Sequence, residues 1–269
     1  MTTMTPRITE VAFELVAAPP AHAEDHRYVH VIGSSVFAAD TPADETWPRH
    51  FVGVLDGRAL FAVDVPDGED PSDGALVDLR RFFAMVDEST WMAAGRAVQV
   101  VGWSRTHRFC GRCAEPTVRA ERFMAMECPR CRLVAFPRVS PAMIALVTEG
   151  PAGNEQQALL ARGVGWPEGM YSCVAGFVEA GETLEACVVR EVREEVGLIV
   201  DQVNYRGSQP WPFPHSLMIG FRARSAGGDL VLDETEIAEA NWYRRDELPP
   251  LPNRISISRR LIEEWRHEA

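Results

Sequence analysis

Lysine is missing from this sequence: its 269 residues include 27 basic side chains other than histidine, and every one is arginine. Also missing is any run of about 18 apolar residues, as a membrane-spanning helix would need, and the N-terminal residues lack the apolar core of a signal peptide. Positive net charge is absent too, because 39 acidic residues give a formal net charge of -12. That balance disfavours tight, nonspecific binding to nucleic acid or to an anionic membrane. We therefore expect a cytoplasmic protein that does not bind membranes.

The remaining composition is that of an ordinary globular chain, with 46% hydrophobic and 25% charged residues. The length is sufficient for more than one domain. In the first hundred residues, apolar runs at 28–37 and 51–63 predict strands, with a hairpin turn at Asp56-Gly57. Helical spacing over 76–102, broken near Ser89-Thr90, predicts one or two helices. We expect residues 1–102 to form a small α/β domain that supports the rest or mediates dimer contact.

Four of the six cysteines form two close pairs in the segment that follows. Each pair has two residues between its cysteines, and 14 residues separate the pairs: Cys110, Cys113, Cys128 and Cys131. Four thiolates at this spacing suit a tetrahedral structural zinc site. Buried thiols or a redox pair are the alternatives. The spacing therefore predicts a zinc ribbon over 103–138 that stabilises the fold, since four cysteine ligands leave no open position for catalysis.

Strand-like and helical segments alternate over residues 139–269. We expect strands at 143–148 and 157–162, a helix at 183–196, strands near 203–207, 217–224 and 230–232, and a final helix at about 255–267. Strands interleaved with two helices indicate a mixed α/β sandwich, within a chain of the α+β class.

The helix over 183–196 has two distinct faces. One is an apolar stripe at four-residue spacing, and the other carries Glu191, Glu194 and Glu195 at positions i, i+3 and i+4. Like charges so placed repel one another unless a cation lies between them. A solvated charged face is the simplest explanation. A glycine-rich loop before the helix, Arg190 beside the carboxylates and Gly197 at its end instead favour a magnesium or manganese site for phosphate chemistry.

Residues 176–198 match the Nudix box at every fixed position: Gly, five residues, Glu, seven residues, and then Arg-Glu-Val-Arg-Glu-Glu-Val-Gly-Leu. The chain thus resembles the Nudix hydrolases, which cleave a nucleoside diphosphate linked to another group. The resemblance implies an α/β/α sandwich with a mixed sheet. It also implies metal ligation by Glu191, Glu195 and the backbone carbonyl of Ala175, with Glu194 as a water ligand or general base. Glu236 matches a further acidic ligand best, and Glu239 is the alternative.

A second pattern follows the box, Ser208-Gln-Pro-Trp-Pro-Phe-Pro-His-Ser-Leu-Met218. Prolines stiffen a loop, aromatic rings offer flat faces to a base, and Gln209 and Ser216 can supply specific hydrogen bonds. By itself, such a run is more often a loop or a recognition ligand. Directly after a Nudix box, it resembles the signature of the NADH pyrophosphatase family, as does the zinc ribbon. The resemblance extends over roughly residues 94–265.

This second resemblance implies further substrate contacts. They would come from the signature itself and from aromatic, serine and arginine residues outside it: Gln209, Pro210, Trp211, Pro212, Phe213, Pro214, His215, Ser216, Phe136, Phe177, Ser258 and Arg81. Relatives often have tyrosine at position 136, so Phe136 keeps the stacking face and loses the hydroxyl. Family members are homodimers whose two chains form the pocket together, so we expect a dimer.

The sequence therefore predicts a Mg²⁺- or Mn²⁺-dependent hydrolase, with structural Zn²⁺, that cleaves NAD(H) to nicotinamide mononucleotide and AMP. The same pocket would remove NAD caps from RNA 5′ ends. One alternative is a Nudix hydrolase of another dinucleotide, such as ADP-ribose or a diadenosine polyphosphate. Another is a zinc-ribbon nucleic-acid-binding or regulatory protein whose Nudix domain is inactive.

Overall fold

The structure is a computed structural model that describes residues 13–16, 18–20, 26–73 and 75–268. The chain groups into two compact units. One contains residues up to 138 together with 212–215, and the other contains residues 139–211 and 216–269. We call them the N-terminal unit and the C-terminal unit and describe each by itself. The three-part division at 102 and 138 stays a prediction. In the described part of the chain, no helix is long and apolar enough to span a membrane.

A six-stranded sheet forms the main part of the N-terminal unit. Its strands, in spatial order, are β1 (Phe13–Glu14), β4 (Arg49–Leu55), β5 (Arg58–Asp64), β2 (His26–Ile32), β3 (Ser35–Ala39) and β6 (Val77–Asp78). The predicted turn joins β4 to β5, with positive φ of 51° at Asp56 and 76° at Gly57. Positive φ at both turn residues matches the twist of the paired strands. The hairpin prediction is confirmed.

One long helix, α2 (Glu88–Thr106), packs against this sheet, preceded by the short helices α1 (Leu79–Phe82) and η1 (Phe83–Met85). The sequence predicted one or two helices with a break near Ser89-Thr90. The helices are separate, but the break lies a few residues earlier, between Met85 and Glu88. Asp87 caps α2 by accepting a hydrogen bond from the Thr90 N–H, so Thr90 already belongs to the first turn. The ribbon segment follows with three short strands, β7 (Val118–Arg119), β8 (Met126–Glu127) and β9 (Val134–Ala135).

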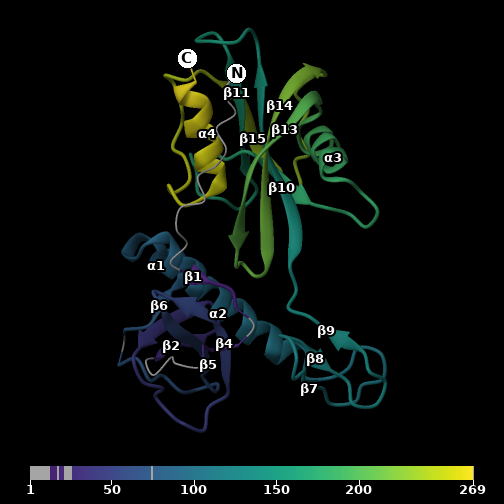
Figure 1. Cartoon of the computed structure of the whole chain (residues 1–269). Helices are drawn as coiled ribbons and strands as arrows, with labels where there is room; N and C mark the ends of the chain where they lie inside the picture. The colour runs from purple at the N-terminus through teal and green to yellow at the C-terminus, as the bar shows by residue number, and fades with distance from the viewer. Residues whose placement is uncertain (1–12, 17, 21–25, 74, 269) are drawn as a thin grey trace. The chain divides into compact units, whose positions relative to one another are not determined.

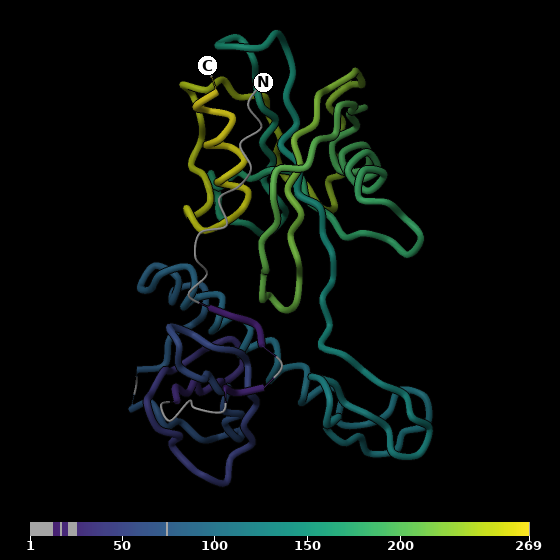
Figure 2. The backbone as a smooth tube through the Cα atoms, viewed as in Figure 1, coloured from purple at the N-terminus to yellow at the C-terminus, as the bar shows by residue number. Residues whose placement is uncertain are grey.

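The C-terminal unit is built on a second sheet of six strands. Five lie in the order β13 (Ile199–Trp211), β14 (Ser216–Gly227), β10 (Ser140–Glu149), β11 (Gln157–Gly163) and β15 (Ile237–Tyr243). The sixth, β12 (Val174–Phe177), pairs antiparallel with β10, whereas β14 pairs parallel with β10. Figure 2 traces β13 and β14 as the two adjacent arms of one long hairpin. The sheet is therefore mixed, as the sequence predicts.

Helices cover both faces of this sheet, α3 (Leu184–Val196) on one and α4 (Ile257–His267) on the other (Figure 1). The alternation of side chains along β10 separates the two cores. Met143, Ala145 and Val147 pack with α3. Ile144 and Leu146 pack with α4. This is the expected α/β/α sandwich.

The strand predicted near 230–232 is wrong, because no strand forms there. The segment instead bonds to the end of α3. Val231 donates its N–H to the carbonyl of Val196, and Asp233 donates its N–H to the carbonyl of Glu195. These bonds satisfy carbonyls that a helix end leaves without partners. Strands β12 and β15 were not predicted.

The boundaries of α3 follow its sequence closely. The Thr183 side chain accepts a hydrogen bond from the Ala186 N–H, and Gly197 ends the helix at φ 77°. A Cβ at position 197 would approach the Asp229 carbonyl to 2.6 Å, so this turn requires glycine. The predicted stripe is Leu184, Val188, Val192 and Val196; the three valines are fully buried, and Leu184 is half-buried against the same core. Both caps and the stripe are confirmed, and they fix which face of α3 carries the glutamates.

Candidate metal and substrate site

One glutamate of α3, Glu191, lies against the backbone of β12. Glu191 and Glu195 are buried, with 9% and 6% of their surfaces exposed, whereas Glu194 on the same helix is exposed. A Cβ built on Gly176 would lie 2.0–2.3 Å from the atoms of the Glu191 carboxyl group. Glycine at 176 therefore leaves the space that this carboxylate occupies, directly beside Ala175.

The two buried carboxyls are difficult to ionise without a cation. Burial, together with the smaller effects of the charges of Glu191, Glu236 and Asp233, raises the pKa of Glu195 to about 8. Burial also raises the pKa of Glu191, with smaller contributions from Glu194 and Glu236. Buried like charges that repel one another fit a divalent cation with oxygen ligands.

The exposed Glu236 joins this group from a loop before β15. Its backbone is fixed at both ends: the Glu236 N–H donates to the Asp233 carbonyl at 3.0 Å, and its carbonyl accepts from the Val164 N–H at 2.7 Å. Asp233 in turn bonds the end of α3. The charges of Glu191 and Glu236 both raise the pKa of Glu195, so the three carboxylates are close enough to interact. Metal ligation by these carboxylates stays a prediction.

Glu239, the alternative ligand, is held elsewhere. One of its carboxylate oxygens accepts from Arg162 at 2.6 Å, and the other accepts a hydrogen bond from the Tyr171 hydroxyl. These two contacts, Tyr171 first, lower the pKa of Glu239. Both oxygens of this carboxylate are therefore occupied, which favours Glu236 over Glu239 as the later ligand.

Arg190 connects the glycine-rich loop to the carboxylate face. Its guanidinium donates to both oxygens of Glu182, at 2.8 and 2.9 Å, and to the Phe177 carbonyl at 3.0 Å. It also contacts Glu191 and Glu194, each at 2.9 Å. The Arg190 hydrogen bond lowers the pKa of Glu182 to about 2. The match to the Nudix box predicts Arg190 among the catalytic residues, and these contacts are those of a positioning residue.

Replacing Arg190 by lysine should reduce turnover about tenfold, as for loss of a residue that orients metal ligands. A single ammonium cannot bond Glu182 twice and also contact the Phe177 carbonyl and Glu194. The measurement is steady-state turnover with magnesium. Arg193→Lys is the matched control, because Arg193 lies exposed on the same helix. Equal activities of the two variants would contradict the positioning role.

Substitution of Gly176 by alanine should reduce turnover on the order of a hundredfold, because the new methyl group displaces the Glu191 carboxylate. Gly102→Ala is the control, since a Cβ there meets nothing within 4 Å. Both variants are compared by turnover and by thermal unfolding. Full activity of Gly176→Ala would show that the Glu191 carboxylate need not lie against β12.

The signature residues divide between the two units. Gln209 is buried in the C-terminal unit, where its amide donates to the Ile255 carbonyl at 2.7 Å and accepts from the Ile257 N–H at 2.8 Å. It therefore holds the chain at the start of α4. Ser216 is also buried, at the beginning of β14. Pro210 and Trp211 end β13, whereas Pro212, Phe213, Pro214 and His215 group with the N-terminal unit.

Within the N-terminal unit, Pro212 lies close to α2 and Phe213 contacts α1. A Cβ on Gly95 would lie 2.9 Å from the Pro212 ring, so glycine allows this close approach. The Arg80 guanidinium lies over the Phe213 ring at 4.0 Å. Arg80, the neighbour of the predicted Arg81, thus makes the aromatic contact. Substrate binding by the four residues stays a prediction.

The remaining predicted contacts lie in both units. Phe177 is 56% exposed on β12, and Phe136 is 59% exposed in the ribbon, with its ring 5.6 Å from that of Phe123. Exposed aromatic faces of this kind are available for stacking. Ser258 is buried; its hydroxyl bonds the Ser172 hydroxyl at 2.7 Å and accepts from the Cys173 N–H at 3.1 Å. The side chain of Ser258 therefore has a structural role.

The four ribbon cysteines converge on one point. Their sulfur atoms all lie within 4.8 Å of one another, with 3.5 Å between Cys110 and Cys131 and 3.6 Å between Cys113 and Cys128. All four are free thiols. Separations of this size fit the edges of a tetrahedron around zinc, with Zn–S bonds of about 2.3 Å.

Each cysteine pair sits on the same kind of turn. The Arg112 N–H donates to Cys110 Sγ, and the Cys131 N–H donates to Cys128 Sγ, both at 3.4 Å. The Arg112 contact lowers the pKa of Cys110 to about 6. The chain reverses after each pair at a residue of positive φ, Ala114 at 59° and Arg132 at 62°. Thiolates stabilised by backbone N–H groups on two matching turns form a structural zinc site.

Some residues of the site were not found from the sequence. Asp233, the Glu182–Arg190 pairing and the space provided by Gly176 depend on tertiary contacts. The fixed spacing of the box was the sequence signal for Gly176 and for the Glu182–Arg190 pairing, and Asp233, outside the box, had none. Together, the sandwich fold and the carboxylate helix define a hydrolase of the Nudix class.

Known protein families match nearly the whole chain and include the Nudix hydrolases. The NUDIX domain family matches residues 141–265, the NADH pyrophosphatase zinc ribbon domain matches 105–136, and the NADH pyrophosphatase-like rudimentary NUDIX domain matches 12–103. Among solved structures, a NUDIX hydrolase from Nitrosomonas europaea is similar over 60% of this chain and 93% of its own, with 23% identity and a TM-score of 0.48.

Curated relatives are more similar. A protein of Pseudomonas entomophila named NAD-capped RNA hydrolase NudC is 44% identical over 80% of this chain and 76% of its own length. A protein of the same name from Deinococcus radiodurans is 46% identical over 79% of this chain and 75% of its own. The chain therefore belongs to the NADH pyrophosphatase family of zinc-ribbon Nudix hydrolases.

Proposed function

We propose that the protein hydrolyses the pyrophosphate of NAD(H) to nicotinamide mononucleotide and AMP, and that it also removes NAD from the 5′ ends of RNA. The observation that carries the proposal is the buried pair Glu191 and Glu195, coupled to Glu236 beside the backbone of β12. Family relatives named NAD-capped RNA hydrolase support the choice of substrate.

Glu191, Glu195, Glu236 and the Ala175 carbonyl would hold Mg²⁺ or Mn²⁺. The bound cation would neutralise the diphosphate and lower the pKa of water. Space at Gly176 positions Glu191, and the carbonyl of Asp233 fixes the backbone of Glu236. Arg190 orients Glu194 through its contact at 2.9 Å.

In the proposed reaction, a water oxygen attacks one phosphorus atom of the diphosphate, and the bridging oxygen leaves with the other phosphate. Glu194 is the candidate base for the proton of that water, because it is exposed beside the buried pair. The Phe177 ring offers a stacking face, and the exposed Phe136 ring would supply a second face to the pocket of a homodimer. The dimer and a cytoplasmic location belong to this proposal.

Parallel kinetics test the substrate. Turnover of NADH, NAD⁺, an NAD-capped RNA, ADP-ribose and a diadenosine polyphosphate is measured with one metal at a time, magnesium or manganese. We expect the highest kcat/KM for the substrates that contain nicotinamide. A preference for ADP-ribose or the diadenosine compound would reject the proposed substrate. Activity of the wild type no greater than that of Glu195→Gln would instead favour an inactive Nudix domain with a regulatory role.

A further inference from the structure

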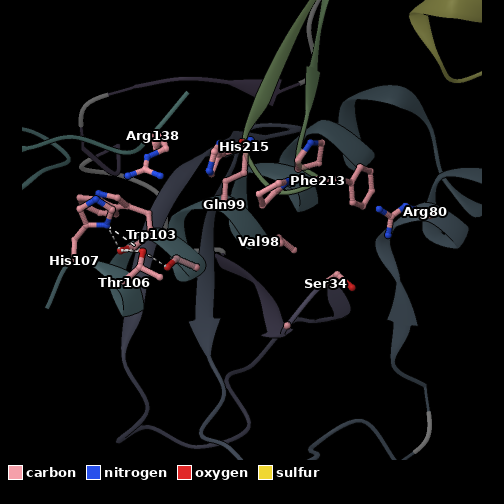
Figure 3. Close-up of a pocket in the computed structure, with 14 residues that line it drawn as sticks. Ser34, Arg80, Val98, Gln99, Trp103, Thr106, His107, Arg138, Phe213 and His215 are labelled. Carbon is pink, nitrogen blue, oxygen red and sulfur yellow. Dashed lines mark hydrogen bonds between the residues drawn. The ribbon is translucent and has the colours of Figure 1, made fainter. Parts of the chain in front are cut away.

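The N-terminal unit contains a cavity whose lining includes four residues of the signature, Pro212, Phe213, Pro214 and His215, and none of the α3 carboxylates. Its volume is about 730 Å³, within the range of small-molecule sites. All of its lining residues belong to this unit: Gly33, Ser34, Arg80, Val98, Gln99, Gly102, Trp103, Thr106, His107, Arg138, Pro212, Phe213, Pro214 and His215. Figure 3 shows these side chains around the opening. The α3 carboxylates lie in the C-terminal unit.

The charge of this lining differs from that of the chain. Although the sequence has 39 acidic residues, no carboxylate of the described residues lines the cavity, whereas Arg80 and Arg138 do. Arg138 is exposed and makes no ion pair with a carboxylate in the described part of the chain. In Figure 3 the two guanidinium groups lie on opposite sides of the lining. Arginine binds phosphate through two parallel hydrogen bonds. The cavity therefore selects for an anion.

The walls between the arginines are largely aromatic or apolar. Trp103, His107, Phe213 and His215 supply rings, and Val98 and the prolines supply apolar surface. Such surfaces accept the flat face of a base. Gln99 lies at the wall without a hydrogen-bond partner among the described residues, and its amide can both donate and accept.

Trp103 contributes ring surface to the wall of the cavity. The residue is 6% exposed, and its indole Nε1–H is buried without an acceptor in the described residues. Because that nitrogen is buried, the surface that Trp103 offers to a ligand is apolar.

We propose that this cavity binds a nucleotide, with its base among the aromatic side chains and its phosphate at Arg80 or Arg138. The ligand chemistry, an aromatic base joined to a phosphate, is shared by a free mononucleotide and by one residue of single-stranded RNA. The site is distinct from the α3 carboxylates, and the inference does not depend on the proposed hydrolysis. The ligand contacts predicted for Pro212, Phe213, Pro214 and His215 would then be made to this nucleotide and not to the diphosphate that is cleaved.

Gly102 provides a sharp test because it lies exposed on α2 at the cavity wall and a Cβ there meets nothing within 4 Å. Gly102→Glu and Gly102→Gln add side chains of nearly the same size that differ in charge. A carboxylate close to a bound phosphate should weaken binding about tenfold relative to the glutamine variant. Loss of the arginine that binds the phosphate should weaken binding in the same direction, so Arg80→Gln and Arg138→Gln are compared to identify it.

Binding is measured without added magnesium or manganese, so that the α3 carboxylates repel phosphate. Calorimetry with AMP tests a free nucleotide, and anisotropy with a short 5′-hydroxyl oligoadenylate, which has no diphosphate to cleave, tests a strand. If either probe binds more weakly to Gly102→Glu than to Gly102→Gln, the result supports the site. The probe that shows the difference tells whether the ligand is a free nucleotide or a strand.

Two results would overturn the inference. The first is equal affinity of the two Gly102 variants for both probes. Failure of both variants and of the wild type to bind either probe counts as the same result. The other is a large rise in the KM for NADH in Gly102→Glu alone, because the cavity would then be part of the substrate site. Thermal unfolding of both variants confirms that each is folded before binding is compared.

Discussion

Replacement of Glu195 by glutamine is expected to reduce NADH turnover by on the order of a thousandfold, as for loss of a carboxylate central to catalysis. Glu195 is the most deeply buried of the glutamates coupled at the site, with 6% of its surface exposed. Glutamine keeps the shape of the side chain and removes the charge that a divalent cation requires. Steady-state kinetics over a range of magnesium concentrations measure the loss.

The same substitution should stabilise the metal-free protein at alkaline pH. Burial raises the pKa of Glu195 in the folded state to about 8, above its ordinary value of 4.5. Ionisation of Glu195 therefore destabilises the folded state. This loss of folding stability is absent below pH 4.5, grows between the two pKa values and is complete above about pH 8. The difference in Tm between Glu195→Gln and wild type should accordingly increase as the pH rises from 5 to 8.

A matched control lies in the first turn of the same helix. Glu185 is exposed, so Glu185→Gln should retain turnover and show little pH-dependent change in Tm. If Glu195→Gln is as active as Glu185→Gln, the carboxylate site is not the catalytic centre. A Tm difference that is the same at pH 5 and pH 8 would contradict the burial argument alone.

Replacement of Cys128 by serine should release the zinc and destabilise the ribbon strongly. Binding of structural zinc contributes on the order of 10 kcal/mol to the folding of small zinc domains. Cys128 has no exposed surface, so the remaining three thiolates cannot recruit water as a fourth ligand without local rearrangement. We expect about one zinc per chain in the wild type and much less in the variant, together with a lower unfolding temperature.

Metal analysis of purified protein and thermal unfolding check this prediction. Cys173→Ser is the control, because Cys173 is buried in the α4-side core of the C-terminal unit, outside the ribbon. That variant should keep its zinc even if the substitution lowers its stability. Zinc well below one per chain in the wild type would reject the structural zinc site.

Helix α3 shows how far the sequence predicts this protein. Its caps at Thr183 and Gly197, its apolar stripe and its glutamate face depend on local spacing, and all are as predicted. Strand β12 has only four residues and no diagnostic alternation, so it was not predicted. The pattern at 230–232 is strand-like, but the backbone N–H groups of the segment bond the end of α3.

The candidate site shows the same limit. Residue types and spacing indicated the metal-binding face, because helix geometry brings i, i+3 and i+4 together. They could not show that the Gln209 amide bonds the backbone at 255 and 257, or that Tyr171 and Arg162 hold Glu239. Those contacts join residues far apart in the sequence, and only the folded sheet brings them together.

The hydrogen bonds from Val231 and Asp233 to the last turn of α3 have a consequence for evolution of the chain. They join the two ends of the long segment between Glu195 and Glu236. The positions of these two glutamates relative to each other therefore depend on these hydrogen bonds. The length of the β13–β14 arms is thereby decoupled from the carboxylate geometry. Insertions and deletions in those arms can alter what the enzyme recognises and leave its bond-breaking centre unchanged.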